Sequence, residues 1–158
     1  MIKLVAMDVD GTLTDGGLYM SGETEFKKFN VRDGYGIAEM LKKGIEAAFI
    51  SGRYSAATEA RALDLGVAKV FNGTKDKLRD LKSIAGELGL PREDVAFIGD
   101  DIPDIPCLQW AGLGMAVFDA CDDVKSASDI VLKARGGEGA VREAARYIIA
   151  LNENSGIK

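Results

Sequence analysis

The stretch Leu4-Val5-Ala6-Met7-Asp8-Val9-Asp10-Gly11-Thr12 is an apolar run that ends in two carboxylates and a glycine. Side chains alternate along a strand, so Asp8 and Asp10 should leave it on the same face. At an effective dielectric of about 20, two like charges about 4 Å apart repel by about 4 kcal/mol. A bound cation would offset this repulsion. The alternative is an Asp-Gly turn that merely closes a buried strand.

The composition is typical of one globular domain. The chain has 158 residues, of which 47% are hydrophobic and 28% charged, and its net charge is −5. We expect a single domain over residues 1–158, with no nucleic acid or membrane as partner, because no Lys/Arg block and no long apolar run is present. The N-terminus has no signal-peptide pattern. Cys107 and Cys121 have neither disulfide-framework nor zinc spacing, so we expect two buried thiols in a cytoplasmic protein.

Histidine is absent from the sequence. Its absence excludes Ser-His-Asp and Cys-His catalysis, histidine metal sites and histidine phospho-relays. Acid–base chemistry must then come from carboxylates, lysine, tyrosine or cysteine.

Short apolar runs alternate with helical patterns along the chain. Expected strands cover about 3–9, Ala47–Ile50, Val70–Phe71, Val95–Ile98, Gly114–Val117 and Ile130–Leu132. Expected helices run from Asp33 to Gly44, to about Leu65, from about Asp76 to Leu88, to about Ala111, near Asp122–Ala127 and from Ala140, before a mobile tail at about 152–158. A hairpin is expected within about 16–30, with its turn at Ser21-Gly22-Glu23. The alternation predicts an α/β fold, a Rossmann-like, mainly parallel sheet with helices on both faces.

Polar clusters follow four of these strands at their C-terminal ends. They contain Asp8 and Asp10, Ser51 and Arg53, Asn72–Lys77, and Gly99–Asp104. In a parallel sheet such clusters meet at one edge, where ligands bind. Grouped carboxylates suit Mg²⁺, the Ser51 hydroxyl and the helix start after it suit a phosphoryl group, and Lys75 or Lys77 supplies positive charge. These groups together suit phosphoryl transfer, with one aspartate as nucleophile and another as acid and base.

The same motifs, in the same order, resemble those of the haloacid dehalogenase superfamily of phosphohydrolases. Asp8-Val9-Asp10-Gly11-Thr12 matches the first motif, Ser51 the second, Lys77 rather than Lys75 the third, and Gly99–Asp104 the fourth. The resemblance implies that Asp8 is the nucleophile and Asp10 the general acid and base. It also implies Mg²⁺ held by Asp8, the main-chain carbonyl of Asp10 and Asp100, with Asp101 and Asp104 as accessory ligands.

The spacing of the motifs leaves no room for a cap domain. About twenty residues separate the first motif from the helix at Asp33, and one helix separates the second motif from the third. A site without a cap is open to water unless the substrate is a macromolecule or a neighbouring subunit covers it. The hairpin is a candidate assembly element, and the alternative is an ordinary edge hairpin.

Four segments are similar to the 3-deoxy-D-manno-octulosonate 8-phosphate phosphatase family. They are Asp33–Ile37, Ser51–Arg53, Gly99–Asp101 and Gly136–Glu143. The resemblance implies Mg²⁺-dependent hydrolysis of that sugar phosphate in lipopolysaccharide biosynthesis, by a homotetramer with shared active sites. It implies substrate contacts from Thr12, Gly52, Arg53 and Arg61. It also implies that Arg142 or Glu138, near the glycines at 136–139, touches the substrate or the neighbour. Alternatively, those glycines form only a flexible loop before a helix.

Two further alternatives remain open at this point. Relatives of the family act on nine-carbon ulosonate 9-phosphates. Arg53 favours the octulosonate, because a nine-carbon-specific relative carries Glu there, while Arg61 is alternatively a solvated helix residue and Asp64 has no assigned role. The second alternative is a non-enzymatic, receiver-like phospho-acceptor module. It is disfavoured, because a receiver needs no acid–base residue at Asp10 and the cluster at Gly99–Asp104 comes too late in the chain.

Overall fold

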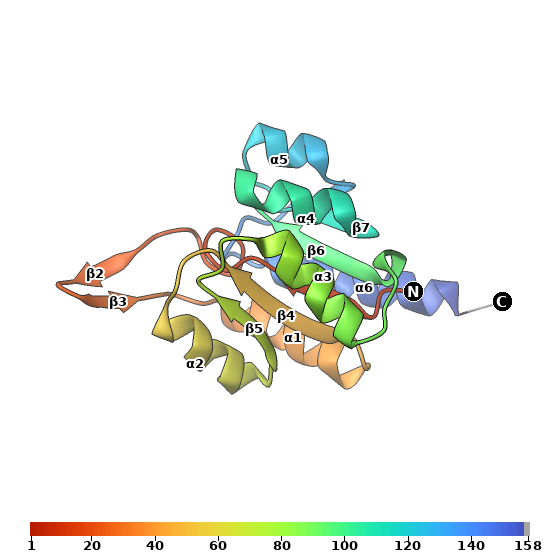
Figure 1. The fold of residues 1–158 in the computed structure, drawn as a ribbon, viewed down its shortest axis with the longest axis horizontal. Coiled ribbons are helices and arrows are strands. Elements are labelled where there is room, and N and C mark those ends of the chain that lie inside the picture. Colours follow the sequence, from red (N-terminus) through yellow and green to blue (C-terminus); the bar gives the residue numbers. More distant parts are fainter. Residues whose placement is uncertain (157–158) are drawn as a thin grey trace.

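The computed structural model describes residues 1–156 and contains a six-stranded sheet in the order β5-β4-β1-β6-β7-β8 (Figure 1). All five strand pairs in this sheet are parallel. The strands are β1 (Leu4–Met7), β4 (Glu46–Ser51), β5 (Lys69–Asn72), β6 (Val95–Gly99), β7 (Leu113–Ala116) and β8 (Ile130–Val131). The central strands β1 and β6 are buried along their whole length, as expected of strands covered on both faces. The predicted fold class is confirmed.

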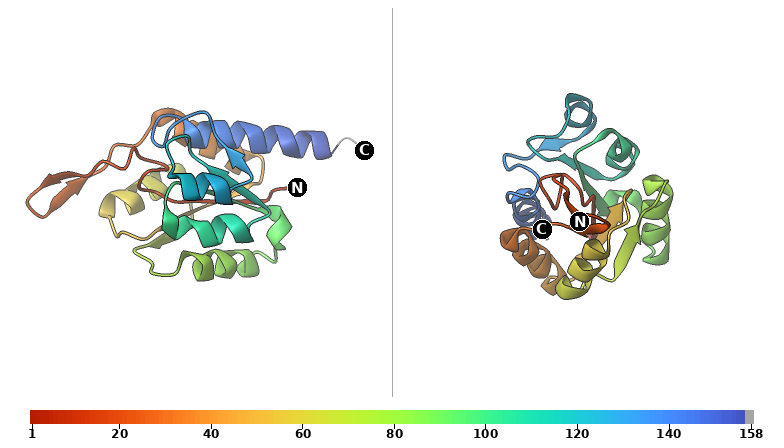
Figure 2. Two further views of the ribbon diagram at one scale, coloured as in Figure 1. Left: turned by 90° about the horizontal axis from the view of Figure 1, so that it is seen from above. Right: turned by 90° about the vertical axis from the view of Figure 1, so that its left-hand side faces the viewer.

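Helices cover both faces of the sheet. They are α1 (Val31–Lys42), α2 (Ala56–Leu65), α3 (Lys77–Glu87), α4 (Ile105–Trp110), α5 (Asp122–Ala127) and α6 (Ala140–Ser155), with short 3-10 helices η1 (Arg92–Asp94) and η2 (Ile102–Asp104). Figure 2 shows α1 and α6 together on one face and α3 and α4 on the other. The chain passes from β1 through β4 to β5 and then returns to β6 beside β1. The order of strands therefore reverses next to β1, where such sheets bind ligands.

Helix α1 begins earlier than the sequence pattern predicts. Asn30 caps it, because its side-chain oxygen accepts from the backbone N–H groups of Arg32 at 2.8 Å and Asp33 at 3.4 Å. The helix therefore starts at Val31, two residues before the predicted Asp33.

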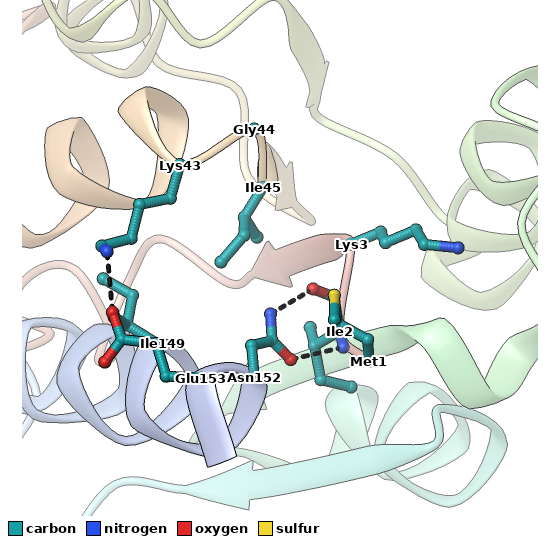
Figure 3. Close-up of a pocket in the computed structure, with 9 residues that line it drawn as sticks. All are labelled: Met1, Ile2, Lys3, Lys43, Gly44, Ile45, Ile149, Asn152 and Glu153. Carbon is teal, nitrogen blue, oxygen red and sulfur yellow. Dashed lines mark hydrogen bonds and ion pairs between the residues drawn. The ribbon is translucent and has the colours of Figure 1, made fainter. Parts of the chain in front are cut away.

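Helix α6 continues to Ser155, so the predicted mobile tail is wrong for residues 152–155. Asn152 exchanges two hydrogen bonds with the backbone of Ile2, accepting at 2.8 Å and donating at 2.7 Å (Figure 3). Lys43 and Glu153 pair at 2.8 Å beside it. These residues line a pocket of about 280 Å³ at the amino ends of β1 and β4, away from the predicted phosphate edge. Residues 157–158 of the predicted tail lie outside the described residues.

The hairpin is a separate two-stranded sheet of β2 (Tyr19–Ser21) and β3 (Thr24–Phe26), which projects from the body of the molecule (Figures 1 and 2). Its apolar side chains are exposed: Leu18 43%, Tyr19 49%, Met20 61% and Phe26 59%. Within residues 1–156, the interval between β1 and α1 contains only the hairpin, and the interval between Ser51 and Lys77 contains only α2 and the sheet strand β5.

The prediction of two buried thiols is half wrong. Cys107 is buried in α4, but Cys121, which stands at the N-cap position of α5, is exposed. Among residues 1–156, no helix has the length and apolar character needed to cross a membrane.

Candidate active site

Three carboxylates meet where β1 and β6 end side by side. Asp8 directly follows β1, Asp100 directly follows β6, and Asp104 ends the short helix η2. Each offers an oxygen, and these oxygens lie within 4.8 Å of one another. Asp8 is 6% exposed and Asp104 is fully buried. The structure therefore gathers charges from positions nearly a hundred residues apart in the sequence.

Lys77, the first residue of α3, is the cation of this cluster. Its Nζ lies 2.7 Å from Asp8 Oδ1 and 2.7 Å from Asp104 Oδ1, and its side chain is 9% exposed. Asp104 Oδ2 accepts from the backbone N–H of Asp100 at 3.0 Å, which holds the loop after β6. Lys75 is exposed to solvent. Lys77 rather than Lys75 is thus the lysine at the cluster, as the motif comparison predicted.

Burial and mutual repulsion disfavour the ionised carboxylates. Burial, and then the charge of Asp104, raises the pKa of Asp8 to about 6 despite the nearby Lys77. Burial and the hydrogen bond with Asp8 raise the pKa of Asp100 to about 9. Burial opposes the charge of Lys77, but Asp8 and Asp104 outweigh it and hold its pKa above the usual range. Three carboxylates around one ammonium leave excess negative charge, and hard oxygen donors with such an excess fit Mg²⁺.

The loop after Asp10 packs against Asp100 so closely that it requires glycine. Gly11 has φ +85°, and a Cβ there would lie 2.0 Å from Asp100 Oδ2. Thr12 is fully buried, and its hydroxyl donates to Asp100 Oδ1 at 3.3 Å. The Thr12 hydroxyl therefore orients Asp100, and the expected substrate contact from Thr12 stays a prediction. Asp10 itself remains 25% exposed and forms an ion pair with Lys27, a residue that the sequence analysis did not single out.

The glycine-rich segment before α6 supports the same loop. A Cβ at Gly136 would lie 1.8 Å from the Gly11 carbonyl oxygen, and one at Gly137, whose φ is +73°, would lie 2.4 Å from the backbone nitrogen of Asp15. Gly137 N–H donates to the carbonyl of Thr12 at 3.0 Å. These glycines allow two backbones to touch. The alternative of a loop that is only flexible is therefore rejected.

We expect Gly136→Ala to destabilise the fold by about 2–4 kcal/mol, because the added methyl group would force the loop at Gly11 to move. Gly86→Ala is the matched control, since a Cβ there meets nothing within 4 Å and the site is inside α3. That change should stabilise the protein by about 0.5–1 kcal/mol. Urea unfolding measures both effects, and equal stabilities of the two variants would contradict the close packing.

Ser51 and its neighbours end β4 beside this cluster. The Ser51 hydroxyl is buried and donates to the carbonyl of Arg53 at 2.8 Å. A Cβ on the exposed Gly52 would lie 3.7 Å from Lys77 Cε, so this turn borders the lysine. Arg53 is half exposed, and its Nε donates to Glu25 Oε1 of the hairpin at 3.2 Å. The helix expected after this turn is α2, which begins at Ala56, is capped by the side chain of Ser55 and ends at the predicted Leu65.

Arg61, an expected substrate contact, and Arg142, expected to touch the substrate or a neighbouring subunit, both contact α1 in this chain. Arg61 pairs with Asp64 at 3.0 Å and donates to the carbonyl of Asn30 at 3.4 Å, so it packs on the start of α1. Arg142 pairs with Glu39 at 2.6 Å and stacks 4.5 Å from the Tyr35 ring, so it also faces α1.

Asp101 and Glu138 lie outside the carboxylate cluster. Glu138 is exposed. Asp101 is exposed too, and its carboxylate accepts from the backbone N–H of Ile102 at 2.8 Å. Asp101 caps η2 and is not grouped with Asp8, Asp100 and Asp104, and its expected accessory role stays a prediction.

A hollow of about 590 Å³ opens beside Lys77. It is lined by Gly52, Thr74, Lys75, Asp76, Lys77, Leu78, Pro103 and Pro106. The carboxylate cluster therefore borders open space at the carboxyl edge of the sheet.

Comparisons with known proteins identify the family. The sequence profile of haloacid dehalogenase-like hydrolases matches residues 63–144. The 3-deoxy-D-manno-octulosonate 8-phosphate phosphatase KdsC of Escherichia coli K12 is 43% identical over 144 residues, which is 90% of this chain and 76% of that protein. The crystal structure of the Moraxella catarrhalis phosphatase of the same name, in complex with magnesium, phosphate and KDO, is 41% identical with a TM-score of 0.94 and covers 97% of this chain and 88% of that one.

A second solved structure agrees. The cobalt-bound phosphatase from Haemophilus influenzae is 40% identical with a TM-score of 0.94, covering 98% of this chain and 91% of that one. The fold and the cluster at the ends of β1 and β6 agree with these sequence and structure similarities. The chain therefore belongs to the haloacid dehalogenase-like hydrolases and, among them, to the 3-deoxy-D-manno-octulosonate 8-phosphate phosphatase family.

Proposed function

We propose that this protein is a Mg²⁺-dependent phosphatase that hydrolyses 3-deoxy-D-manno-octulosonate 8-phosphate to the free sugar acid and phosphate. The observation that carries the proposal is the buried Asp8, 2.7 Å from Lys77 and grouped with Asp100 and Asp104. The homologous Moraxella structure, which holds magnesium, phosphate and KDO, supports the choice of substrate. Membership of a hydrolase family argues against the receiver-like alternative.

The first chemical step uses Asp8 and Asp10. Lys77 stabilises the Asp8 carboxylate, and an oxygen of that carboxylate attacks phosphorus. The bond between phosphorus and the sugar oxygen breaks, and Asp10 gives its proton to the departing oxygen. The products of this step are the free sugar acid and an aspartyl phosphate on Asp8.

The second step regenerates the enzyme. A water molecule attacks the phosphorus of the aspartyl phosphate, and the Asp10 carboxylate takes the proton of that water. The bond to Asp8 breaks and phosphate is released. Asp8, Asp100 and the main-chain carbonyl of Asp10 would hold Mg²⁺, which neutralises phosphoryl charge when bound.

Substrate choice is tested by comparing kcat/KM for octulosonate 8-phosphate with that for nine-carbon ulosonate 9-phosphates. We expect the eight-carbon substrate to be preferred by about tenfold or more, a range that pocket contacts commonly supply. Arg53→Glu should reduce this preference, with Lys42→Glu as the matched control, because it reverses an exposed charge at the end of α1. A clear preference of the unaltered protein for a nine-carbon substrate would contradict the assignment.

We also propose that the protein works in the cytoplasm as a homotetramer with shared active sites. The exposed apolar side chains of the hairpin, among them Met20 and Phe26, support association through this element. Light scattering should give a tetramer, and Met20→Glu should shift it toward smaller species. A fully active monomer would contradict the proposed assembly.

A further inference from the structure

Lys27 follows strand β3 of the hairpin and reaches into the active site. Its side chain is completely buried, and its Nζ pairs with Asp10 Oδ1. Asp10 lies on the loop after β1, 17 residues away in sequence. A buried ammonium is costly unless it is paired, so its position next to Asp10 is closely defined.

Lys27 belongs to a row of four alternating charges. Its Nζ lies 3.6 Å from Glu25 Oε1, and the same Glu25 oxygen accepts from Arg53 Nε at 3.2 Å. Glu25 is 14% exposed and Arg53 is 48% exposed, so the row leads from the site interior to solvent. It joins the loop of Asp10, the base of the hairpin and the loop after β4.

We propose that Lys27 is a positioning residue for Asp10. It fixes the carboxyl group that gives a proton to the leaving sugar oxygen, and Glu25 fixes Lys27 in turn. The hairpin thereby serves the chemistry of its own subunit, in addition to the association proposed above. This inference rests on the proposed function, because it assigns a step to Asp10.

The proposed role predicts a dependence on the leaving group. When a sugar alkoxide departs, the bond between phosphorus and oxygen breaks as Asp10 gives up its proton, so the placement of Asp10 matters. A 4-nitrophenolate is stable as an anion and departs without that proton. A purely structural role of Lys27 would lower the rates for both substrates equally, because both need the same fold.

The experiment measures kcat/KM for octulosonate 8-phosphate and for 4-nitrophenyl phosphate on the full chain with Mg²⁺. Lys27→Met should lower the first value by about 30- to 100-fold and the second by less than about threefold, within the range of general acid catalysis. Lys27→Arg, which keeps the charge, should restore most of the loss. Lys28→Met changes the exposed neighbouring lysine and should leave both values unaltered.

Circular dichroism checks that each variant is folded. If Lys27→Met does not fold, Lys27→Gln takes its place, since an amide tolerates polar surroundings without the charge, and the same difference between substrates is expected. Equal losses on both substrates, or no loss, would overturn the role of Lys27. An unaltered protein without activity on either substrate would instead overturn the proposed function, and the role of Lys27 with it.

Discussion

Asp8→Asn should abolish phosphate release, with a loss of about 10⁴-fold or more in kcat, because removing the nucleophile removes covalent catalysis entirely. The neutral amide cannot form the aspartyl phosphate. The fold should survive, because asparagine has nearly the same shape and removes a charge that burial disfavours. Release of phosphate from octulosonate 8-phosphate measures the effect.

The matched control for this change is Asp123→Asn, which neutralises an exposed carboxylate in α5. Its turnover should stay within about twofold, as is usual for surface changes remote from a site. Comparable turnover by Asp8→Asn would remove Asp8 from its role as nucleophile.

The sequence predicted well those parts of the fold that depend on local pattern. The run Val95–Ile98 is apolar at every position, as expected of a strand buried on both faces, and β6 is buried throughout. Asp8 and Lys77 are 69 residues apart in the sequence, yet their pairing was predictable. Asp8 follows the end of β1 and Lys77 begins α3, and both positions lie at the same edge of the sheet.

Contacts that depend on tertiary packing could not be predicted in this way. Glu25 and Lys27 stand among other polar residues of the hairpin, a pattern typical of solvated positions, and only the folded course of the hairpin buries the Lys27 side chain. Gly136 and Gly137 fit a flexible loop as well as a close approach of two backbones, and only the folded position of Gly11 distinguishes these interpretations. The local pattern is compatible with a helix that ends near Asn152. The hydrogen bond between Asn152 and Ile2, which is distant in the sequence, cannot be predicted from that pattern.

Mg²⁺ should stabilise the protein strongly at pH 8 and only weakly at pH 5.5. The pKa of Asp8, about 6, and that of Asp100, about 9, are both raised in the metal-free fold. A carboxyl group whose pKa is higher in the folded than in the unfolded protein stabilises the fold while it is protonated. This stabilisation is complete below the unfolded pKa near 3.8 and is lost as pH rises through the folded pKa. Metal-free protein should therefore lose stability from pH 5 to 9, by on the order of 1 kcal/mol for Asp8 alone, since about one pKa unit of its stabilisation is left at pH 5. Thermal unfolding with and without Mg²⁺ measures the difference in Tm.

Asp100→Asn tests which carboxylate is responsible. The variant should lose the Mg²⁺-dependent rise in Tm at pH 8 and about 100-fold or more in activity, because the metal loses a direct ligand. Without metal it should be at least as stable as the unaltered protein at pH 8, since one carboxyl group with a raised pKa has been removed.

Asp101→Asn is the control in the same loop, because the Asp101 side chain accepts from Ile102 N–H outside the cluster and asparagine can still accept that hydrogen bond. It should keep the full response to Mg²⁺. An equal rise in Tm for Asp100→Asn and the unaltered protein, or a rise that does not change with pH, would place the metal away from Asp8 and Asp100.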